Sequence, residues 1–260
     1  MQVLTRPWGA MHYSDQGPKD APVVVFANSL GTDLRLWDPV LPLLPREYRY
    51  IRYDKRGHGL SDLGGVATLA DMAEDVIALI EHVGGPVILV GLSIGGLIAQ
   101  RVAADRPDLL RALVLSNTAA KLGTSDGWSA RIMAVRDGGV ASIADAIMER
   151  WFGAAFRATA ELAAWRNMLA RTSDDGYIAA CEVLAAGDQT QATAQLRLPT
   201  LVIAGSEDGA SPAEIVRATA DLIPGANFHI IDNVGHLPCV EAPEAYAALL
   251  TAFLKENTHV

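Results

Sequence analysis

Short, mainly apolar runs recur through the first and last parts of the chain. Runs of this length, bounded by polar or turn-forming residues, predict strands that are buried on both faces of a sheet. They occupy residues 23–27, 48–53, 87–90, 110–116, 200–204 and 227–231.

Helical patterns alternate with these runs. Apolar residues at Met72, Val76, Leu79 and Ile80 have the spacing of one helix face, which predicts a helix over 69–82. Further helices are predicted over 94–105 and 243–255. Strands that alternate with helices predict right-handed crossovers and a mainly parallel sheet covered on both faces.

The alternation stops in the middle of the chain, where no strand pattern occurs and helical patterns follow one another. We therefore expect an α/β core formed by residues 1–120 and 197–260, with a helical cap over 121–196. Parallel sheets bind ligands at the carboxyl edge, so a cap inserted there would shape a substrate pocket. The predicted cap helices cover 130–137, 142–152, 158–172 and 177–186.

Composition narrows the possible partners. The 260 residues are half hydrophobic, which suits one domain with an insertion, and the formal net charge is −9. An acidic chain has no electrostatic footprint for nucleic acid or anionic lipid, so we expect neither as a partner. The uncharged stretch 83–100 contains Pro86 and several glycines, and predicts a buried strand, turn and helix rather than a membrane span.

The cysteines and the start of the chain bear on location. Cys181 and Cys239 are far apart and predict no disulfide framework. The first ten residues lack the basic start and apolar run of a signal peptide. We therefore expect a cytoplasmic protein, whose oligomeric state the sequence leaves open.

A G-x-S-x-G pattern at 91–95 follows the run 87–90 and precedes the predicted helix 94–105. In a strand–turn–helix context, this pattern places a serine on a sharp turn with its hydroxyl exposed. Ser93 is therefore the candidate nucleophile. The N-terminus of the helix supplies backbone donors, and we expect the N–H of Ile94 to face a developing oxyanion.

A serine nucleophile needs a base and an orienting acid. His236 lies in a glycine-flanked loop after the last predicted strand, at the same sheet edge as Ser93. His82 lies on a predicted helix and His259 near the chain end. Asp208 follows the run 200–204 and is the candidate acid, with its neighbour Glu207 as the competitor. The order serine, acid, histidine is that of α/β-hydrolases.

The second oxyanion donor is expected from the loop after the run 23–27. The N–H of Leu30 is the candidate, and that of Ser29 is the alternative. The sequence contains no H-E-x-x-H, paired C-x-x-C or phosphate-binding G-x-x-x-x-G-K-[ST] pattern, so we expect no metal and no cofactor.

Several segments together resemble the 3-oxoadipate enol-lactonases, and the resemblance covers essentially the whole chain. It implies an α/β-hydrolase fold and hydrolysis of a γ-lactone that carries a carboxylate arm, a step in the catabolism of aromatic compounds. The segments are Asn28 to Trp37, Arg52 to Asp62, Gly91 to Gly96, Arg150 to Phe152, Gly176 with Tyr177 and Cys181, and Val240 to Pro243.

Recognition of an anionic small molecule by an acidic protein must be local, and arginine grips a carboxylate with two parallel hydrogen bonds. Arg131, with Trp128 beside it in the expected cap, is the first candidate, and Arg35 near the oxyanion loop is the second. Each arginine is otherwise a solvated surface charge. Another carboxylesterase or C–C hydrolase of the same fold, or a non-catalytic ligand receptor, remains open.

Overall fold

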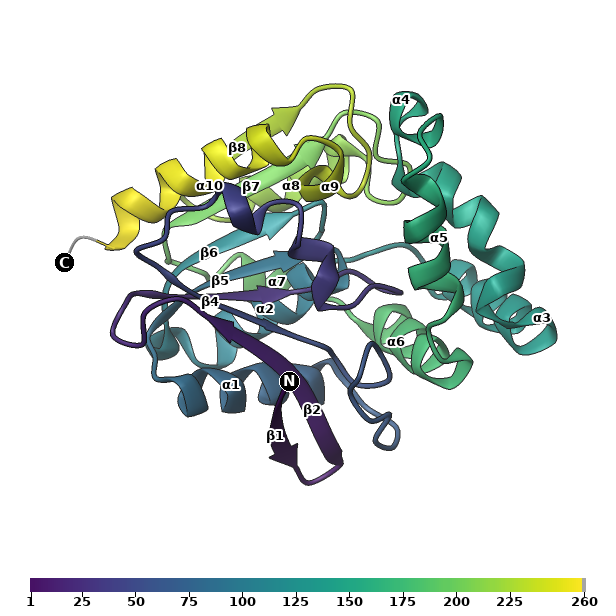
Figure 1. The fold of residues 1–260 in the computed structure, drawn as a ribbon, viewed down its shortest axis with the longest axis horizontal. Helices are drawn as coiled ribbons and strands as arrows, with labels where there is room; N and C mark the ends of the chain where they lie inside the picture. Colours follow the sequence, from purple (N-terminus) through teal and green to yellow (C-terminus); the bar gives the residue numbers. More distant parts are fainter. Residues whose placement is uncertain (259–260) are drawn as a thin grey trace.

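An eight-stranded, mainly parallel sheet forms the centre of the molecule (Figure 1). The computed structural model describes residues 1–258, so His259 lies outside the described residues. The strand order is β1-β2-β4-β3-β5-β6-β7-β8, with β1 and β2 antiparallel to their neighbours and the other pairs parallel. The strands are β1 (Gln2–Arg6), β2 (Gly9–Gln16), β3 (Val23–Ala27), β4 (Arg49–Tyr53), β5 (Val87–Leu92), β6 (Leu110–Ser116), β7 (Thr200–Gly205) and β8 (Asn227–Ile231).

The six predicted strands are confirmed as β3 to β8, and the predicted mainly parallel sheet is confirmed with them. The antiparallel hairpin β1–β2 was not predicted. Its residues are buried on one side at most, with exposed and half-buried positions alternating along β1. A strand at the edge of a sheet needs no continuous apolar run, so the hydrophobic pattern is weak there.

Helices cover both faces of the sheet, with α1 and α2 on the side opposite α10 (Figure 1). The start of α1 is a capping box, in which Thr68 and Asp71 bond each other's backbone N–H groups. The helices of the core are α1 (Leu69–Val83), α2 (Ile94–Asp105), α8 (Ala213–Asp221), α9 (Pro238–Glu241) and α10 (Pro243–Thr258), with 3-10 turns η1 (Leu34–Trp37), η2 (Leu41–Leu43) and η3 (Pro107–Leu109).

The middle of the chain contributes helices and no strand between residues 121 and 196, and α3 packs against α5 and α6. Two helices predicted over 130–137 and 142–152 form one element, α3, which kinks at Gly139 (φ 73°, ψ 167°). α7 packs against α2 of the core. These helices are α3 (Ser125–Trp151), α4 (Ala154–Arg157), α5 (Leu162–Ala170), α6 (Asp174–Ala186) and α7 (Thr190–Thr193).

The helix predicted over 158–172 is shorter in the structure, where α5 begins at Leu162. The hydroxyl of Thr159 instead bonds the carbonyl of Phe156. Local bonds of this kind compete with helix formation, and apolar spacing alone does not reveal them.

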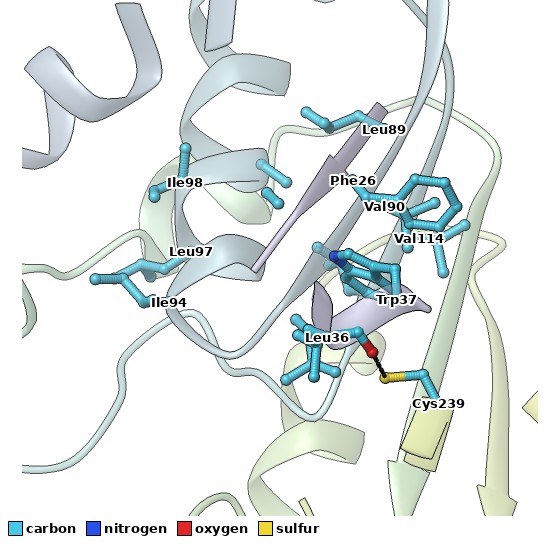
Figure 2. Close-up of a cluster of buried hydrophobic side chains, with 14 of the residues drawn as sticks. Phe26, Leu36, Trp37, Leu89, Val90, Ile94, Leu97, Ile98, Val114 and Cys239 are labelled. Carbon is cyan, nitrogen blue, oxygen red and sulfur yellow. Dashed lines mark hydrogen bonds between the residues drawn. The ribbon is translucent and has the colours of Figure 1, made fainter. Parts of the chain in front are cut away.

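An apolar cluster lies beneath the loop that follows β3 (Figure 2). The ring centroids of Phe26 and Trp37 are 4.7 Å apart. The indole N–H of Trp37 donates to the side-chain oxygen of Asn28 over 2.7 Å. Cys239 is buried here beside Leu36 as a free thiol. This packing fixes the loop against the core.

The uncharged stretch 83–100 forms the end of α1, the buried strand β5 and the first part of α2. Among residues 1–258, no helix has the length and apolar character needed to cross a membrane.

Candidate active site

Ser93 lies at the sharp turn between β5 and α2, with left-handed backbone angles of φ 58° and ψ −122°. The turn requires small residues around it. A Cβ at Gly91 would clash with the backbone of Gly95, and a Cβ at Gly95 would clash with the carbonyl of Ala27. The Ser93 N–H bonds the carbonyl of Ser116 on the next strand, which helps to hold the strained residue.

His236 lies in the loop after β8, at the same sheet edge. The backbone N–H of His236 donates to the carbonyl of Trp151 at the end of α3 over 2.6 Å. The imidazole ring of His236 and the indole ring of Trp151 are stacked, with their centroids 6.5 Å apart. Its Nδ1 is 2.8 Å from Oδ2 of Asp208, which follows β7. This contact leaves Nε2 for the substrate side, the arrangement that a general base needs.

Five hydrogen bonds hold the Asp208 carboxylate. Oδ1 accepts the N–H groups of Ala210 and Ser211, and Oδ2 accepts Nδ1 of His236, the Ser211 hydroxyl and the Asn117 amide. Burial favours the neutral acid, but the charge of His236 and these hydrogen bonds outweigh it and hold the pKa of Asp208 below its usual value. The acid is therefore ionised at neutral pH, as required to stabilise an imidazolium.

Asn117 and Ser211 were not singled out in the sequence. Asn117 has a left-handed φ of 45° just after β6, and its amide reaches Asp208 over 2.9 Å. The position of an asparagine at the carboxyl end of a predicted strand was the only signal that the sequence offered. Ser211 is three residues beyond Asp208 in a loop and carried no such signal.

Glu207, the competitor for the acid, is exposed and forms no hydrogen bond or ion pair with His236 among the described residues. Its carboxylate accepts the N–H of Ala154 over 3.3 Å, at the start of α4. The structure thus brings Asp208 and not Glu207 to the histidine.

The predicted oxyanion donors belong to two segments, the loop after β3 and the start of α2. The start of α2 is in close contact with the end of β3, because Gly95 lies against the carbonyl of Ala27. The Ser29 hydroxyl is 3.5 Å from Nε2 of His236. Among residues 1–258, the N–H groups of Ser29, Leu30 and Ile94 donate no hydrogen bond. These N–H groups therefore have no partner among the described residues, as a donor to an oxyanion requires.

Ser93 and His236 open into a cavity of about 250 Å³ between the core and α3. Arg131 lies beside Trp128 there, with its guanidinium carbon 5.1 Å from the centre of the indole ring. The cavity is lined by Ser93, Leu122, Gly123, Thr124, Gly127, Trp128, Arg131, Arg150, Ala210 and His236.

Arg150 also lines the cavity, and the sequence did not predict it as a candidate ligand contact. Its Nε donates to the carbonyl of Gly209 over 3.1 Å. Partial burial and the positive charge of Arg131 lower its pKa. In the part of the chain that the structure describes, neither arginine has a carboxylate partner within 4.0 Å. The two guanidinium groups of the cavity therefore form no ion pair within the described residues, although the charge of Asp208 acts on Arg150.

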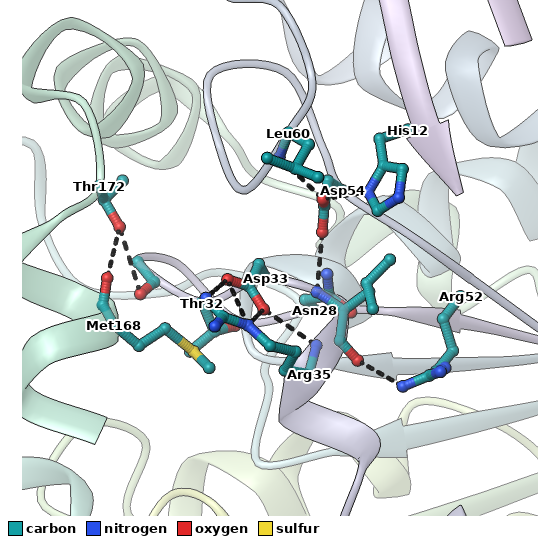
Figure 3. A network of polar contacts seen from close by, with 12 residues as sticks. His12, Asn28, Thr32, Asp33, Arg35, Arg52, Asp54, Leu60, Met168 and Thr172 are labelled. Atoms are coloured by element: carbon teal, nitrogen blue, oxygen red, sulfur yellow. Dashed lines mark hydrogen bonds and ion pairs between the residues drawn. The ribbon is translucent and has the colours of Figure 1, made fainter. Parts of the chain in front are cut away.

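Arg35 does not line this cavity. Its guanidinium binds both carboxylate oxygens of Asp33, as Figure 3 shows. It faces a separate cavity of about 370 Å³ between the core and α5, together with His12 and Asp54. The carboxylate of Asp54 is already bonded to His12 and to the N–H groups of Leu34 and Leu60. The geometry therefore favours Arg131 over Arg35 as the ligand contact.

The described residues hold no group of three or more histidine, cysteine or acidic side chains arranged to bind a metal ion.

Comparisons with known proteins agree with this geometry. A model of the alpha/beta hydrolase family matches residues 24–249. The chain is 35% identical to 3-oxoadipate enol-lactonase 1 of Acinetobacter baylyi, over 98% of this chain and 97% of that protein.

Two solved structures have the same fold over nearly the whole chain. An enol-lactonase from Burkholderia xenovorans superposes with a TM-score of 0.94 at 32% identity, covering 98% of this chain and 100% of the other. A thermophilic esterase from Thermogutta terrifontis superposes with a TM-score of 0.91 at 30% identity, covering both chains fully (100% each). Sequence, elbow geometry and fold together show that this chain belongs to the alpha/beta hydrolase family and resembles its 3-oxoadipate enol-lactonases.

Proposed function

We propose that this protein opens the lactone ring of 3-oxoadipate enol-lactone to give 3-oxoadipate, in the catabolism of aromatic compounds. The observation that carries the proposal is the cavity shared by Ser93, His236 and two arginines without carboxylate partners. A neutral ester would not compensate that charge, whereas a lactone with a carboxylate arm would. The 35% identity to an enol-lactonase supports the same substrate.

The reaction follows from the roles of the side chains. Nε2 of His236 takes the proton of the Ser93 hydroxyl as its oxygen attacks the lactone carbonyl, and Asp208 stabilises the imidazolium. The N–H groups of Ile94 and Leu30, with Ser29 as the alternative to Leu30, bind the tetrahedral oxyanion.

Collapse of the tetrahedral intermediate breaks the ring C–O bond. The leaving group is an enolate that stays attached through the opened ring; it takes the proton back from the His236 imidazolium and becomes a ketone, which returns His236 to its neutral form. A water molecule, deprotonated by His236, then attacks the ester on Ser93 and releases the second carboxylate.

We assign recognition of the carboxylate arm to Arg131, with Arg150 beside it and Trp128 as a wall of the pocket. A charge-assisted bidentate contact contributes on the order of 2–3 kcal/mol, which is roughly a 30- to 150-fold effect on kcat/KM. The structure of the Thermogutta terrifontis esterase, whose fold this chain shares, was obtained with malate bound, which is a small carboxylate.

The test compares two substrates, synthetic 3-oxoadipate enol-lactone and p-nitrophenyl acetate, which is neutral. Arg131→Ala should lower kcat/KM on the lactone roughly 30- to 150-fold and leave the neutral ester nearly unchanged. Arg136→Ala is the matched control, because Arg136 is exposed on the same helix and pairs with Glu182 instead.

Equal losses on both substrates would show that the cap is disturbed and would remove Arg131 from the proposal. Efficient hydrolysis of p-nitrophenyl acetate without hydrolysis of the lactone by the wild-type protein would point to a general carboxylesterase. Failure of a fluorophosphonate probe to label Ser93 would favour a non-catalytic receptor.

A further inference from the structure

Two buried side chains from the segment after β4 hold the loop that follows β3. Nζ of Lys55 donates to the carbonyl oxygens of Ser29 and Thr32, the latter over 3.2 Å. Nε2 of His58 accepts the N–H of Gly31 over 3.1 Å. The exposed fractions of Lys55 and His58 are 3% and 1%. Lys55 and His58 thus bind two carbonyls and one N–H of the candidate oxyanion loop.

The tautomer of His58 follows from its partners. Its Nδ1 is 3.0 Å from the carbonyl of Arg56, which can only accept, so Nδ1 carries the proton. Nε2 is then free to accept from Gly31, and a second proton there would break that contact. Burial, aided by the charge of Lys55, holds the pKa of His58 well below its usual value, so the ring stays neutral.

Lys55 has no carboxylate within 4.0 Å among residues 1–258. Burial lowers its pKa to about 7, although Asp54 and Asp33 favour the charged form. A buried amine is costly unless it is hydrogen-bonded, so its bonds to two loop carbonyls are what offset the cost. An apolar side chain would avoid that cost but leave both carbonyls unpaired.

The contact with Ser29 has a direct consequence for catalysis. The carbonyl of Ser29 and the N–H of Leu30 belong to one peptide unit, which is planar and, when trans, points these two groups in opposite directions. Fixing the carbonyl on Lys55 therefore aims the Leu30 N–H away from Lys55. That N–H donates no hydrogen bond among the described residues.

We propose that Lys55 and His58 are positioning residues that orient the Leu30 N–H as the second oxyanion donor. Neither side chain touches the substrate, and both act through the loop that they bind. The inference rests on the proposed function in one respect, namely that Ser93 is the nucleophile whose tetrahedral intermediate needs the donor.

The experiment uses Lys55→Met, which keeps an unbranched side chain that is one heavy atom shorter and removes the donor. Ser61→Ala is the matched control, because Ser61 lies in the same segment and bonds Asp54 and His12 but not the oxyanion loop. Loss of a whole oxyanion donor lowers kcat by roughly 10²- to 10³-fold, so a loosened donor should cost roughly 10- to 100-fold. On p-nitrophenyl acetate, Lys55→Met should lose this much in kcat with little change in KM, while Ser61→Ala stays near wild type.

A pair of inhibitors separates oxyanion binding from general damage. A trifluoromethyl ketone becomes tetrahedral when Ser93 adds to it, whereas the matching methyl ketone binds without reaction. Lys55→Met should weaken the first by the same factor as kcat and leave the second unchanged. Unchanged kcat, or equal weakening of both ketones, would overturn the proposal.

His58 provides a second test that does not depend on the folding of Lys55→Met. His58→Gln presents a carbonyl oxygen to Gly31, and His58→Leu does not, so the glutamine variant should retain the higher kcat at similar KM. Equal kcat values would overturn the role of His58. Fluorophosphonate labelling of the wild type separates the two hypotheses: without labelling the proposed function itself fails, and with labelling but normal Lys55→Met kinetics only this inference fails.

Discussion

Replacing Asp208 with asparagine should reverse the tautomer of His236, the candidate base, and the hydrogen bonds around Asp208 show why the amide cannot avoid this. Oδ1 of Asp208 accepts the backbone N–H groups of Ala210 and Ser211 over 2.7 and 2.9 Å. These backbone N–H groups are fixed in direction and can only donate, so the carbonyl oxygen of the asparagine must occupy the position of Oδ1. Its NH2 group then faces Nδ1 of His236, where Oδ2 lies 2.8 Å away in the wild type.

An NH2 group is a donor, so it favours a histidine whose Nδ1 is unprotonated and whose Nε2 carries the proton. In that form Nε2 cannot take the proton of Ser93. The substitution that imposes the wrong tautomer in a serine hydrolase lowers kcat by about 10⁴-fold. This corresponds to about 5.4 kcal/mol of lost transition-state stabilisation. The Ser211 hydroxyl can rotate to accept from the new amide, and the Asn117 amide, which loses its bond to Oδ2, keeps its bond to the carbonyl of Gly235. The fold should therefore survive.

The assay is hydrolysis of p-nitrophenyl acetate together with the rate of fluorophosphonate labelling at Ser93, both of which need the base. Glu207→Gln is the matched control, because it makes the same change of charge at the adjacent residue, which is exposed. It should stay near wild type. A loss of less than tenfold in Asp208→Asn, or an equal loss in Glu207→Gln, would refute the reasoning.

Three further outcomes are expected. Ser93→Ala should lower kcat by several powers of ten, with losses near 10⁶ typical for a triad nucleophile, while circular dichroism stays unchanged; retention of most activity would exclude Ser93. Gly95→Ala should cost on the order of 3 kcal/mol or more in urea unfolding because its Cβ meets the Ala27 carbonyl, whereas Gly65→Ala, with no atom within 4 Å, should be nearly neutral. Burial raises the pKa of Glu241 to about 7, so the folded protein binds this proton more tightly than the unfolded chain. The group then contributes stability at low pH that is lost as the pH rises toward 7, so the free energy of unfolding of the wild type minus that of Glu241→Gln should fall from pH 5 to pH 8; a rise in this value would contradict the sign.

Much of the architecture followed from local patterns. The buried strands are continuous apolar runs because both faces of a parallel sheet are covered, and such runs need no knowledge of the partner strand. The nucleophile turn is equally local. Its glycines, its serine and the flanking strand and helix all lie within residues 87–105, so the sequence identified Ser93 as a candidate without a contact map.

The histidine and the acid were predicted by a less local rule. His236 and Asp208 each follow a predicted strand, and parallel strands bring their carboxyl ends to one edge of the sheet. This rule placed both loops near Ser93. It could not separate Asp208 from Glu207, because adjacent residues in a loop point in directions that only the folded backbone determines.

Only the tertiary structure determines which side chains form hydrogen bonds with Asp208 and with the loop after β3. Asn117 meets Asp208 across 91 residues of chain, and Lys55 meets the oxyanion loop across 26. A hydrogen bond requires atoms to lie within about 3 Å of each other, and a sequence carries no distance at that scale between distant segments. For the same reason, the sequence could not decide between Arg131 and Arg35 as the ligand contact. Arg131 lines the cavity that contains Ser93 and His236, and Arg35 is held by Asp33, because helix packing and a local ion pair, rather than residue type, determine where a long charged side chain points.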